Sequence, residues 1–186
     1  MPVAEPDRLD CQLRRVIRAW DWQTDDIEAL THLLHRAYAG LLAQGLHFTA
    51  TDQSPETTRR RMEGGHPFLI ELDGQVIGTM TLSYPVRHWD NDPVYYARPG
   101  VALLSQFGLE PAYQGQGYGR VLFDHAVAWC SGHGCSELCL DTSDQALHLI
   151  QMYEQWGFRV VAAHQWQSVN YSSVVMALDL LQPIRG

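Results

Sequence analysis

Three glycines fall within five residues in one run of this chain, Gln114-Gly115-Gln116-Gly117-Tyr118-Gly119. The preceding residues, from Val101 to Leu109, are mostly apolar and predict a strand, and the following residues have the spacing of an amphipathic helix. Glycine lets the backbone approach a ligand closely, and a helix that begins at the loop adds unpaired N–H donors at its positive end. The strand–loop–helix unit therefore predicts a binding site for the phosphate groups of a nucleotide-like cofactor.

Three kinds of phosphate loop can be compared with this run by their spacing. A P-loop needs a Gly-Lys pair, which the chain lacks. The Gly-x-Gly-x-x-Gly turn of dinucleotide-binding folds ends on Arg120 or Leu122 instead of glycine, although Glu137 stands near the position of its acidic partner, so that reading stays open. The third pattern, Gln/Arg-x-x-Gly-x-Gly/Ala, is matched by Gln114, Gly117 and Gly119.

A second motif lies downstream of the loop and its helix. The segment from Glu137 to Asp141 alternates like a short strand, and the segment from Gln145 to Trp156 has helical spacing. This second helix ends in Tyr153-x-x-x-Gly157-Phe158, with the glycine at the position of a left-handed cap. The two motifs, in this order, resemble the signatures of the GNAT superfamily of N-acyltransferases, in which the first motif is the acetyl-CoA pyrophosphate loop.

The other predicted elements fit the order of elements in that family. Asp25 and Glu28 suggest a capping box before a long helix, Ser54-Pro55 begins a short helix, and Asp73-Gly74 is a strong hairpin signal. The remaining patterns predict a strand at 16–20, a long helix at 27–41, strands at 68–72 and 75–82, and two final strands at 159–163 and 172–180. The resemblance implies an α/β (α+β) GNAT acyl-CoA N-acyltransferase fold. Its mixed, mostly antiparallel sheet has about seven strands and is accompanied by about four helices.

Length and composition predict how the chain is organised. A chain of 186 residues with 46% hydrophobic residues is expected to build one core, so we predict a single domain at 13–182 after a loose leader at 1–12. The residues from Pro85 to Pro99 read as an irregular insertion. No apolar stretch predicts a membrane span or a signal peptide, and we expect a cytoplasmic protein.

The charge of the chain limits its partners. A formal net charge of -8 argues against nucleic acid, which binds basic surfaces, and mildly favours a cationic substrate. The basic run Arg59-Arg60-Arg61 is interpreted as the solvated face of a short helix. We expect no membrane partner, and either a monomer or a homodimer.

Cysteine and histidine residues gather after the glycine loop, at Cys130, His133, Cys135 and Cys139. Structural zinc sites usually show paired Cys-x2-4-Cys knuckles, and this segment has one loose pairing at most. Cys130 falls on the apolar face of a predicted helix, and Cys139 lies within a predicted strand. We therefore expect buried free thiols and no metal.

The resemblance also implies roles for particular residues. It implies acetyl-CoA as the co-substrate, with its pantetheine arm against Phe107, Gly108 and Leu109. The backbone N–H of Leu109 would donate to the acetyl oxygen, and Tyr153 would act as the general acid that protonates the sulfur. The pyrophosphate would lie against Gln114, Gly115, Gln116, Gly117, Tyr118, Gly119 and Arg120.

The general base is not assigned by the resemblance. The strand before the loop, where relatives often carry Glu or His, reads Ala102-Leu103-Leu104-Ser105-Gln106-Phe107. Candidates nearby or on the acceptor side are Tyr38, His47, His88, Asp90 and Glu110. A neutral amine or a chain of waters would need none of them.

The aromatic insertion around Trp89 suggests a wall of the acceptor pocket, since aromatic faces beside carboxylates suit a cation. Its candidate substrate residues are His88, Trp89 and Asp90, together with Tyr38 on the first helix. A packed surface loop or a dimer contact is the alternative interpretation of the insertion.

The resemblance implies an N-acetyltransferase, and we expect it to act on a primary amine of a small molecule. A protein N-terminus or lysine as the acceptor is one alternative. A non-catalytic acyl-CoA-binding sensor is the other, because an intact glycine loop serves binding as well as catalysis.

Overall fold

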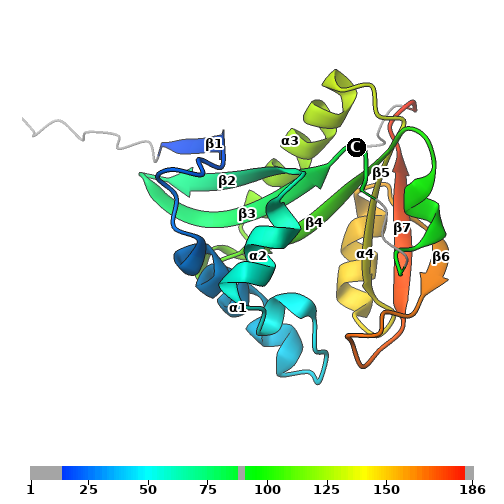
Figure 1. Cartoon of the computed structure of the whole chain (residues 1–186), viewed down its shortest axis with the longest axis horizontal. Coiled ribbons are helices and arrows are strands. Elements are labelled where there is room, and N and C mark those ends of the chain that lie inside the picture. Colours follow the sequence, from blue (N-terminus) through cyan, green and yellow to red (C-terminus); the bar gives the residue numbers. More distant parts are fainter. Residues whose placement is uncertain (1–13, 88–90, 183–186) are drawn as a thin grey trace, which may run out of the picture.

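One twisted sheet forms the frame of the molecule (Figure 1). The computed structural model describes residues 14–87 and 91–182, and within these ranges seven strands lie in the order β1-β2-β3-β4-β5-β7-β6. Neighbouring strands are antiparallel except for β4 and β5, which are parallel. The strands are β1 (Arg15–Ala19), β2 (His66–Leu72), β3 (Gln75–Ser83), β4 (Val101–Leu109), β5 (Glu137–Ser143), β6 (Arg159–His164) and β7 (Ser173–Asp179).

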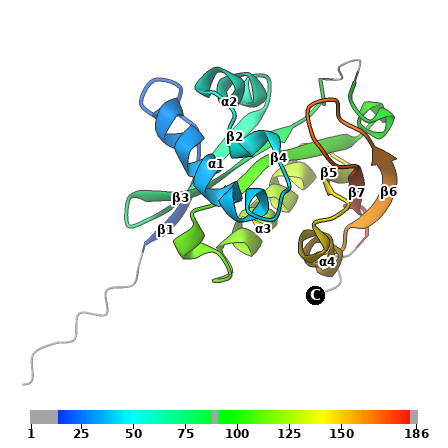
Figure 2. The ribbon, with the colours of Figure 1, turned by 90° about the horizontal axis from the view of Figure 1, so that it is seen from below.

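Helices cover both faces of this sheet (Figures 1 and 2). The longer helices in the described ranges are α1 (Ile27–Leu42), α2 (Pro55–Met62), α3 (Tyr118–Gly132) and α4 (Leu147–Gln155). In Figure 2, α1 and α2 lie on one face and α3 and α4 on the other. Successive residues of β2 contact the two helix layers: Ile70 packs against residues of α3, and its neighbour Leu69 packs against residues of α1 and α2. The predicted mixed, mostly antiparallel GNAT fold is confirmed.

Local sequence signals account for most element ends. Ser54 caps α2 by accepting a hydrogen bond from the Thr57 N–H at 3.2 Å, and the Asp73-Gly74 turn has the positive φ angles that a tight hairpin requires. The predicted capping box of α1 is wrong by one residue, since the side chain of Asp26 accepts from the first-turn N–H groups. Asp25 instead forms an ion pair with Arg18 on β1.

Strands β4 and β5 separate along their length. They pair only from Val101 to Leu103 on β4 and from Glu137 to Cys139 on β5, and the strands diverge toward the lower part of Figure 1. Beyond Leu103, the edge of β4 that faces β5 therefore has no neighbouring strand. Unpaired backbone N–H and C=O groups along such an edge are available to a ligand.

A bulge lies in β4 at this divergence. Ser105 pairs with Thr81 and Gly108 with Thr79, so Gln106 and Phe107 together oppose one residue of β3. Gln106 adopts a left-handed backbone conformation with φ of 49°, which is uncommon for a residue with a side chain. Its buried side chain is held by hydrogen bonds with Gln53 and Thr81, which offset the strain.

The irregular insertion contains a short 3-10 helix, η2 (Val94–Ala97), whose Tyr96 is buried. Residues 88–90 of the insertion and the predicted leader at 1–12 lie outside the described residues, so the proposed division of the chain at residue 13 stays a prediction. Among the helices of the described ranges, none combines the length and the apolar character needed to cross a bilayer.

Candidate active site

The glycine loop joins the end of β4 to the start of α3. Gly115 and Gly117 have φ angles of 73° and 88°, so both positions use a backbone conformation that glycine adopts without strain. Gly117 is the N-cap residue of α3, and no side chain caps this helix end. The N–H groups of the first turn of α3 therefore have no acceptor within the helix, and they can donate hydrogen bonds to an anion beside the loop.

A cavity of about 610 Å³ lies beside this loop. We call it the loop cavity. It is bounded by the end of β4, the C-terminal half of α1, the glycine loop and one face of α4. The predicted cofactor residues Phe107, Gly108, Leu109, Gln114, Gly115, Gly117, Gly119 and Arg120 all line it. Gln116 and Tyr118 belong to the same loop but are not among the lining residues.

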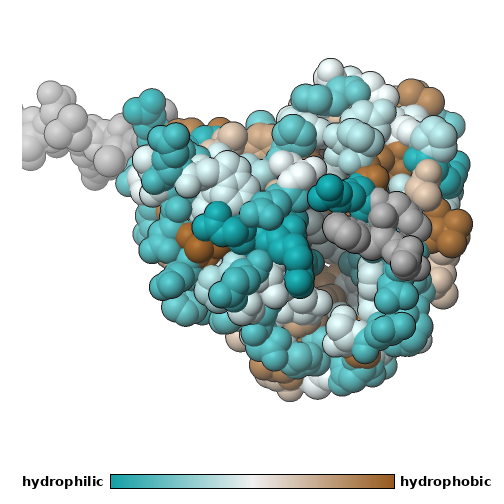
Figure 3. All heavy atoms as spheres, viewed as in Figure 1, coloured by the Kyte–Doolittle hydropathy of each residue, from teal (hydrophilic) through white to brown (hydrophobic). Residues whose placement is uncertain are grey.

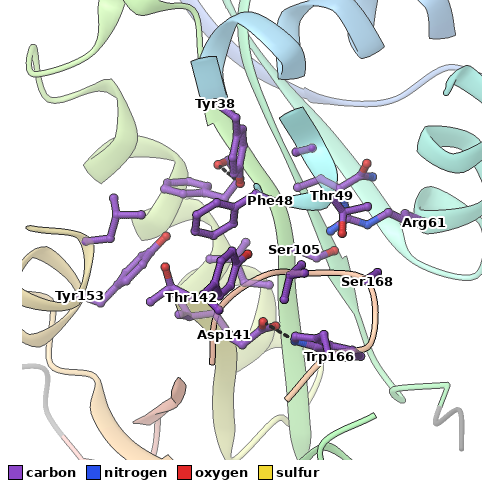
Figure 4. A pocket seen from close by; sticks show the side chains of 18 residues that line it. Tyr38, Phe48, Thr49, Arg61, Ser105, Asp141, Thr142, Tyr153, Trp166 and Ser168 are labelled. Atoms are coloured by element: carbon purple, nitrogen blue, oxygen red, sulfur yellow. Dashed lines mark hydrogen bonds between the residues drawn. The ribbon is translucent and has the colours of Figure 1, made fainter. Parts of the chain in front are cut away.

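A second cavity of about 280 Å³ lies between the diverging parts of β4 and β5 and opens between α2 and the segment before β7 (Figure 3). We call it the tyrosine cavity, because Tyr38, Tyr153 and Tyr171 line it. Its walls also include the short helix η1 (Thr49–Thr51) and both diverging strands. The close view in Figure 4 shows side chains from these separate elements converging on one space.

The two cavities meet at the bulge of β4. The residues that line both are Tyr38, Phe107, Leu149 and Tyr153. Two ligands, one in each cavity, would therefore approach each other beside two phenol groups and the open edge of β4. This arrangement suits the transfer of a group from one ligand to the other.

Tyr153 is held at this junction by the motif that follows it. The Phe158 N–H donates to the Tyr153 carbonyl at 3.0 Å, and Gly157 has a φ of 96°. This geometry is a Schellman motif, and the rings of Tyr153 and Phe158 make its usual apolar contact with centroids 5.7 Å apart. The Tyr-x3-Gly-Phe pattern thus ends α4 and fixes the backbone of its tyrosine, whose side chain points into the tyrosine cavity (Figure 4).

Burial sets the protonation of the two phenols at the junction. Desolvation raises the pKa of Tyr153 above its ordinary value, and it raises the pKa of Tyr38 as well. Tyr38 also donates a hydrogen bond to the Phe107 carbonyl at 3.0 Å, which ties α1 to the bulge. Both phenols therefore carry their protons throughout the physiological pH range.

The backbone of Leu109 is oriented by its neighbour. The Glu110 N–H donates to Ile77 of β3 at 2.8 Å, and successive N–H groups of a strand point to opposite edges. The N–H of Leu109 therefore points away from β3, toward the open edge of β4. The Leu109 carbonyl on that same edge accepts a hydrogen bond from the Gln114 side chain.

The side chain of Gln114 makes hydrogen bonds within the protein. Its Nε2 donates to the Leu109 carbonyl at 3.0 Å and to the Ala37 carbonyl at 3.2 Å. The side chain thus fastens the loop to β4 and α1. Gly108 serves the same packing, because a Cβ there would lie 3.1 Å from the Cβ of Ala37.

The tyrosine cavity carries one charged group of each sign. Asp141 on β5 accepts a hydrogen bond from the Tyr96 hydroxyl at 2.9 Å and another from the Trp166 indole at 2.8 Å. Arg61 on α2 enters from the opposite wall, so its interpretation as part of a solvated face is wrong, although Arg59 and Arg60 are exposed. Sequence reasoning missed both residues, since no local pattern distinguishes them from other charged positions.

Several other predicted acceptor-side residues lie elsewhere. His47 pairs with Asp52 at 2.9 Å in an exposed position, and Glu110 forms a two-pronged ion pair with Arg36. Neither lines the tyrosine cavity. The candidates His88, Trp89 and Asp90 lie outside the described residues, whereas Tyr38 is at the junction of the cavities.

The cysteine cluster does not converge on one point. Cys130, Cys135 and Cys139 are free and buried, as predicted for these three positions. Cys130 and Cys135 belong to one core cluster and Cys139 to another, while the His133 ring stacks on Trp129 at 3.8 Å. Among the residues in the described ranges, no three metal-ligating side chains gather.

Comparison with known proteins identifies the family. The family model described as "Acetyltransferase (GNAT) family" matches residues 27–158, a span that includes the glycine loop and the Tyr153 motif. The chain belongs to the GNAT family. This GNAT protein is accordingly an acyltransferase.

Individual GNAT relatives agree in sequence and in fold. A curated S-(2-succino)cysteine N-acetyltransferase of Bacillus subtilis (strain 168) is 27% identical over 139 residues, which are 72% of this chain and 78% of the relative. The structure of the ribosomal-protein-S18-alanine N-acetyltransferase from Escherichia coli superposes with a TM-score of 0.68 at 20% identity, covering 93% of this chain and 97% of that one. A GNAT family acetyltransferase from Elizabethkingia anophelis with acetyl-CoA bound gives a TM-score of 0.64 at 15% identity, covering 89% and 97%. The last two comparisons show the shared fold.

Proposed function

We propose that this GNAT protein transfers an acetyl group from acetyl-CoA to a primary amine of a small molecule. The observation that carries the proposal is the meeting of the loop cavity and the tyrosine cavity at Tyr153, Tyr38 and the bulge of β4. One cavity suits a phosphate-bearing co-substrate, and the other suits a compact acceptor with charged groups. The proposed reaction takes place where they join.

The residues of the loop cavity fit acetyl-CoA. The pantetheine arm would lie along the open edge of β4, where the Leu109 N–H points outward and the carbonyls of Phe107 and Leu109 already accept hydrogen bonds from Tyr38 and Gln114. The glycine loop offers helix N–H groups for the pyrophosphate. Arg120 lines the same cavity and adds a positive charge. An acetyl-CoA complex of a GNAT neighbour with the same fold supports this assignment.

The chemistry joins the amine nitrogen to the acetyl carbon as the carbon–sulfur bond breaks. Leu109 would donate its backbone N–H to the acetyl oxygen and stabilise the negative charge that develops there. Tyr153 would donate its phenolic proton to the departing sulfur and regain one from solvent. The ammonium form of the acceptor must lose one proton before attack and another afterwards.

The raised pKa of Tyr153 is compatible with this role. Burial raises the pKa of the phenol because it disfavours the phenolate. A thiolate formed in the same cavity is also desolvated, so its proton affinity rises above that of a thiol in water. The proton affinities of the phenolate and the thiolate therefore rise together, and Tyr153 keeps its proton at every physiological pH.

A small acceptor fits the tyrosine cavity better than a protein chain. The cavity measures about 280 Å³ and is walled by η1, α2 and the segment that holds Trp166 and Tyr171. This space suits a compact molecule, at the small end of the range for ligand pockets. The B. subtilis relative is named for a cysteine derivative, which supports a small-molecule acceptor, whereas the E. coli structure is named for a protein acceptor and shares the fold alone.

The test is thiol release from acetyl-CoA across a panel of small amines and peptides, with Tyr153→Phe compared with the parent protein. We expect turnover on small amines and a loss in kcat of about 10²–10⁴-fold in the variant, the range of general acid catalysis. Tyr95→Phe is the matched control, because Tyr95 lies on η2 and lines neither cavity. Its kinetics should equal those of the parent.

Each contrary result points to a different alternative. Turnover on peptides alone would replace the small molecule with a protein acceptor. Tight acetyl-CoA binding without turnover on any amine would favour the sensor. Equal kcat values for Tyr153→Phe and the parent would exclude Tyr153 as the proton donor while keeping the enzyme.

A further inference from the structure

Arg61 places a guanidinium group in the tyrosine cavity. It lies in the last turn of α2 and lines the cavity, half-buried, opposite the wall that holds Asp141 (Figure 4). Within the described ranges, no carboxylate lies within 4.0 Å of its nitrogen atoms, and its Nη1 donates a hydrogen bond to the side chain of Gln53. An arginine carries five N–H donors and stays protonated even where burial lowers its pKa, as it does here.

The guanidinium is held in place by a network of amide groups. Nη1 of Arg61 donates to Oε1 of Gln53 at 2.7 Å. Nε2 of Gln53 donates in turn to the Thr58 hydroxyl at 2.7 Å and to Oε1 of Gln106 at 2.9 Å. The buried network connects α2 to the bulge of β4, and its neutral members orient the arginine without neutralising its charge.

A half-buried guanidinium that lines a cavity is suited to bind an anionic ligand. Desolvation of an unpaired guanidinium is unfavourable, and a carboxylate is the group that its planar fork binds best after phosphate. The phosphates of the proposed co-substrate would lie in the loop cavity, which Arg61 does not line. An anion that pairs with the Arg61 guanidinium would therefore belong to the molecule in the tyrosine cavity.

We propose that Arg61 binds a carboxylate of the acceptor, so that the substrate is an amino acid or a similar small amine with a carboxylate group. The inference rests on the proposed acetyltransferase function and names its substrate class. Asp141 on the opposite wall would attract the ammonium end of the same molecule. A zwitterion would thus complement both charges, whereas a simple alkylamine would leave Arg61 unpaired.

The experiment compares L-amino acids with their primary amides, which keep the amine and lose the negative charge. Initial rates of thiol release and direct calorimetric binding in the presence of coenzyme A are both measured. We expect the parent to prefer the acids, and Arg61→Gln to reduce kcat/KM and affinity for the acids about tenfold or more while changing the values for the amides little. Arg61→Lys, which keeps the charge without the fork, should retain part of the preference.

Arg60→Gln is the matched control, since Arg60 lies on the same helix but is exposed and outside the cavity. It should keep the preference for the acids. An equal effect of Arg61→Gln on acids and amides, or a parent that prefers amides, would overturn the proposal. Should Arg61→Gln fail to fold, the acid-to-amide ratio of the parent and of Arg61→Lys still decides, because a structural role of Arg61 predicts no preference.

The two proposals can fail separately. Turnover on amines without a preference for acids would keep the acetyltransferase and refute the carboxylate site. Arg61-dependent binding of acids without turnover would support the carboxylate site and refute the proposed reaction. Absence of both turnover and binding across the panel would count against both.

Discussion

At the scale of single residues, the candidate site combines two buried phenols with one acidic and one basic side chain. Tyr38 and Tyr153 are phenols that burial keeps protonated, and Asp141 is a carboxylate stabilised by two donated hydrogen bonds. Arg61 carries the charge opposite to that of Asp141, and a hydrogen bond to Gln53 orients its guanidinium group. The chemistry of the site follows from these surroundings more than from the residue types.

The pH dependence of turnover tests the protonation of Tyr153. A proton donor with an ordinary tyrosine pKa would lose activity as the pH approaches about 10. Because burial raises the pKa of Tyr153, we expect kcat to show no decline assigned to this residue between about pH 8 and pH 10. A descending limb in that range that disappears in Tyr153→Phe would contradict the prediction.

At the scale of elements, glycines with positive φ angles terminate or begin the helices that build the site. Gly117 begins α3 and Gly157 ends α4, and both lie beside residues that line a cavity. An L-residue in either place is strained by its backbone alone. Substitution of Gly117 tests the role of the loop in binding, and substitution of Gly157 tests the role of the helix cap in folding.

Gly117→Ala tests the glycine loop as a phosphate site. A Cβ at this position meets no atom within 4 Å, so the substitution acts through a backbone cost of about 1–2 kcal/mol that shifts the loop N–H groups. We expect weaker acetyl-CoA binding by about tenfold, measured by calorimetry. Gly74→Ala is the control, because Gly74 has a similar φ of 81° and equal space but lies in the β2–β3 hairpin. Weakening by both substitutions alike would deny the loop a specific role.

Gly157→Ala tests the cap of α4. Gly157 has a φ of 96°, and an added Cβ would lie 3.1 Å from a methyl group of Leu178. We expect the free energy of unfolding to fall by about 1–2 kcal/mol in urea titrations, together with a loss of turnover as Tyr153 moves. Gly132→Ala is the control, since this helical glycine has open space and no positive φ, and it should be neutral or slightly stabilising. Equal stabilities for Gly157→Ala and the parent would refute the Schellman role.

At the scale of the whole molecule, buried acidic groups that stay neutral make the fold sensitive to alkali. Burial raises the pKa values of Tyr38, Tyr153 and Tyr171, and it raises that of Cys139 to about 12. In the unfolded chain these groups ionise near their ordinary values of about 10 for tyrosine and about 8.5 for cysteine. The folded protein therefore holds more protons than the unfolded chain at high pH.

The sign of the effect follows from this difference in bound protons. The stabilisation from these groups is complete below their unfolded pKa values and declines as the pH rises above them. We expect the urea midpoint to fall progressively between about pH 8.5 and pH 11. A midpoint that stays constant over this range would show that the phenols and thiols are solvated in the folded state.

The sequence alone determined the fold class and the location of the glycine loop. The β2–β3 hairpin, the glycine loop and the Tyr153 motif are specified by neighbours a few residues apart, because turn geometry and helix caps depend on local backbone angles. The extent of β4, from Val101 to Leu109, was likewise predicted from its apolar run. The prediction that Asp25 caps α1 was wrong, because the Asp25 carboxylate pairs with Arg18 on β1 and the next residue, Asp26, caps the helix.

The tertiary structure alone decided what lines the tyrosine cavity. Arg61 faces inward because Gln53 and Gln106, 53 residues apart in the chain, form one buried network beneath it. Asp141 lies across from it because β4 and β5 diverge after Leu103. Such long-range contacts depend on how the packed elements meet, so they cannot be predicted from the local periodicity of the sequence.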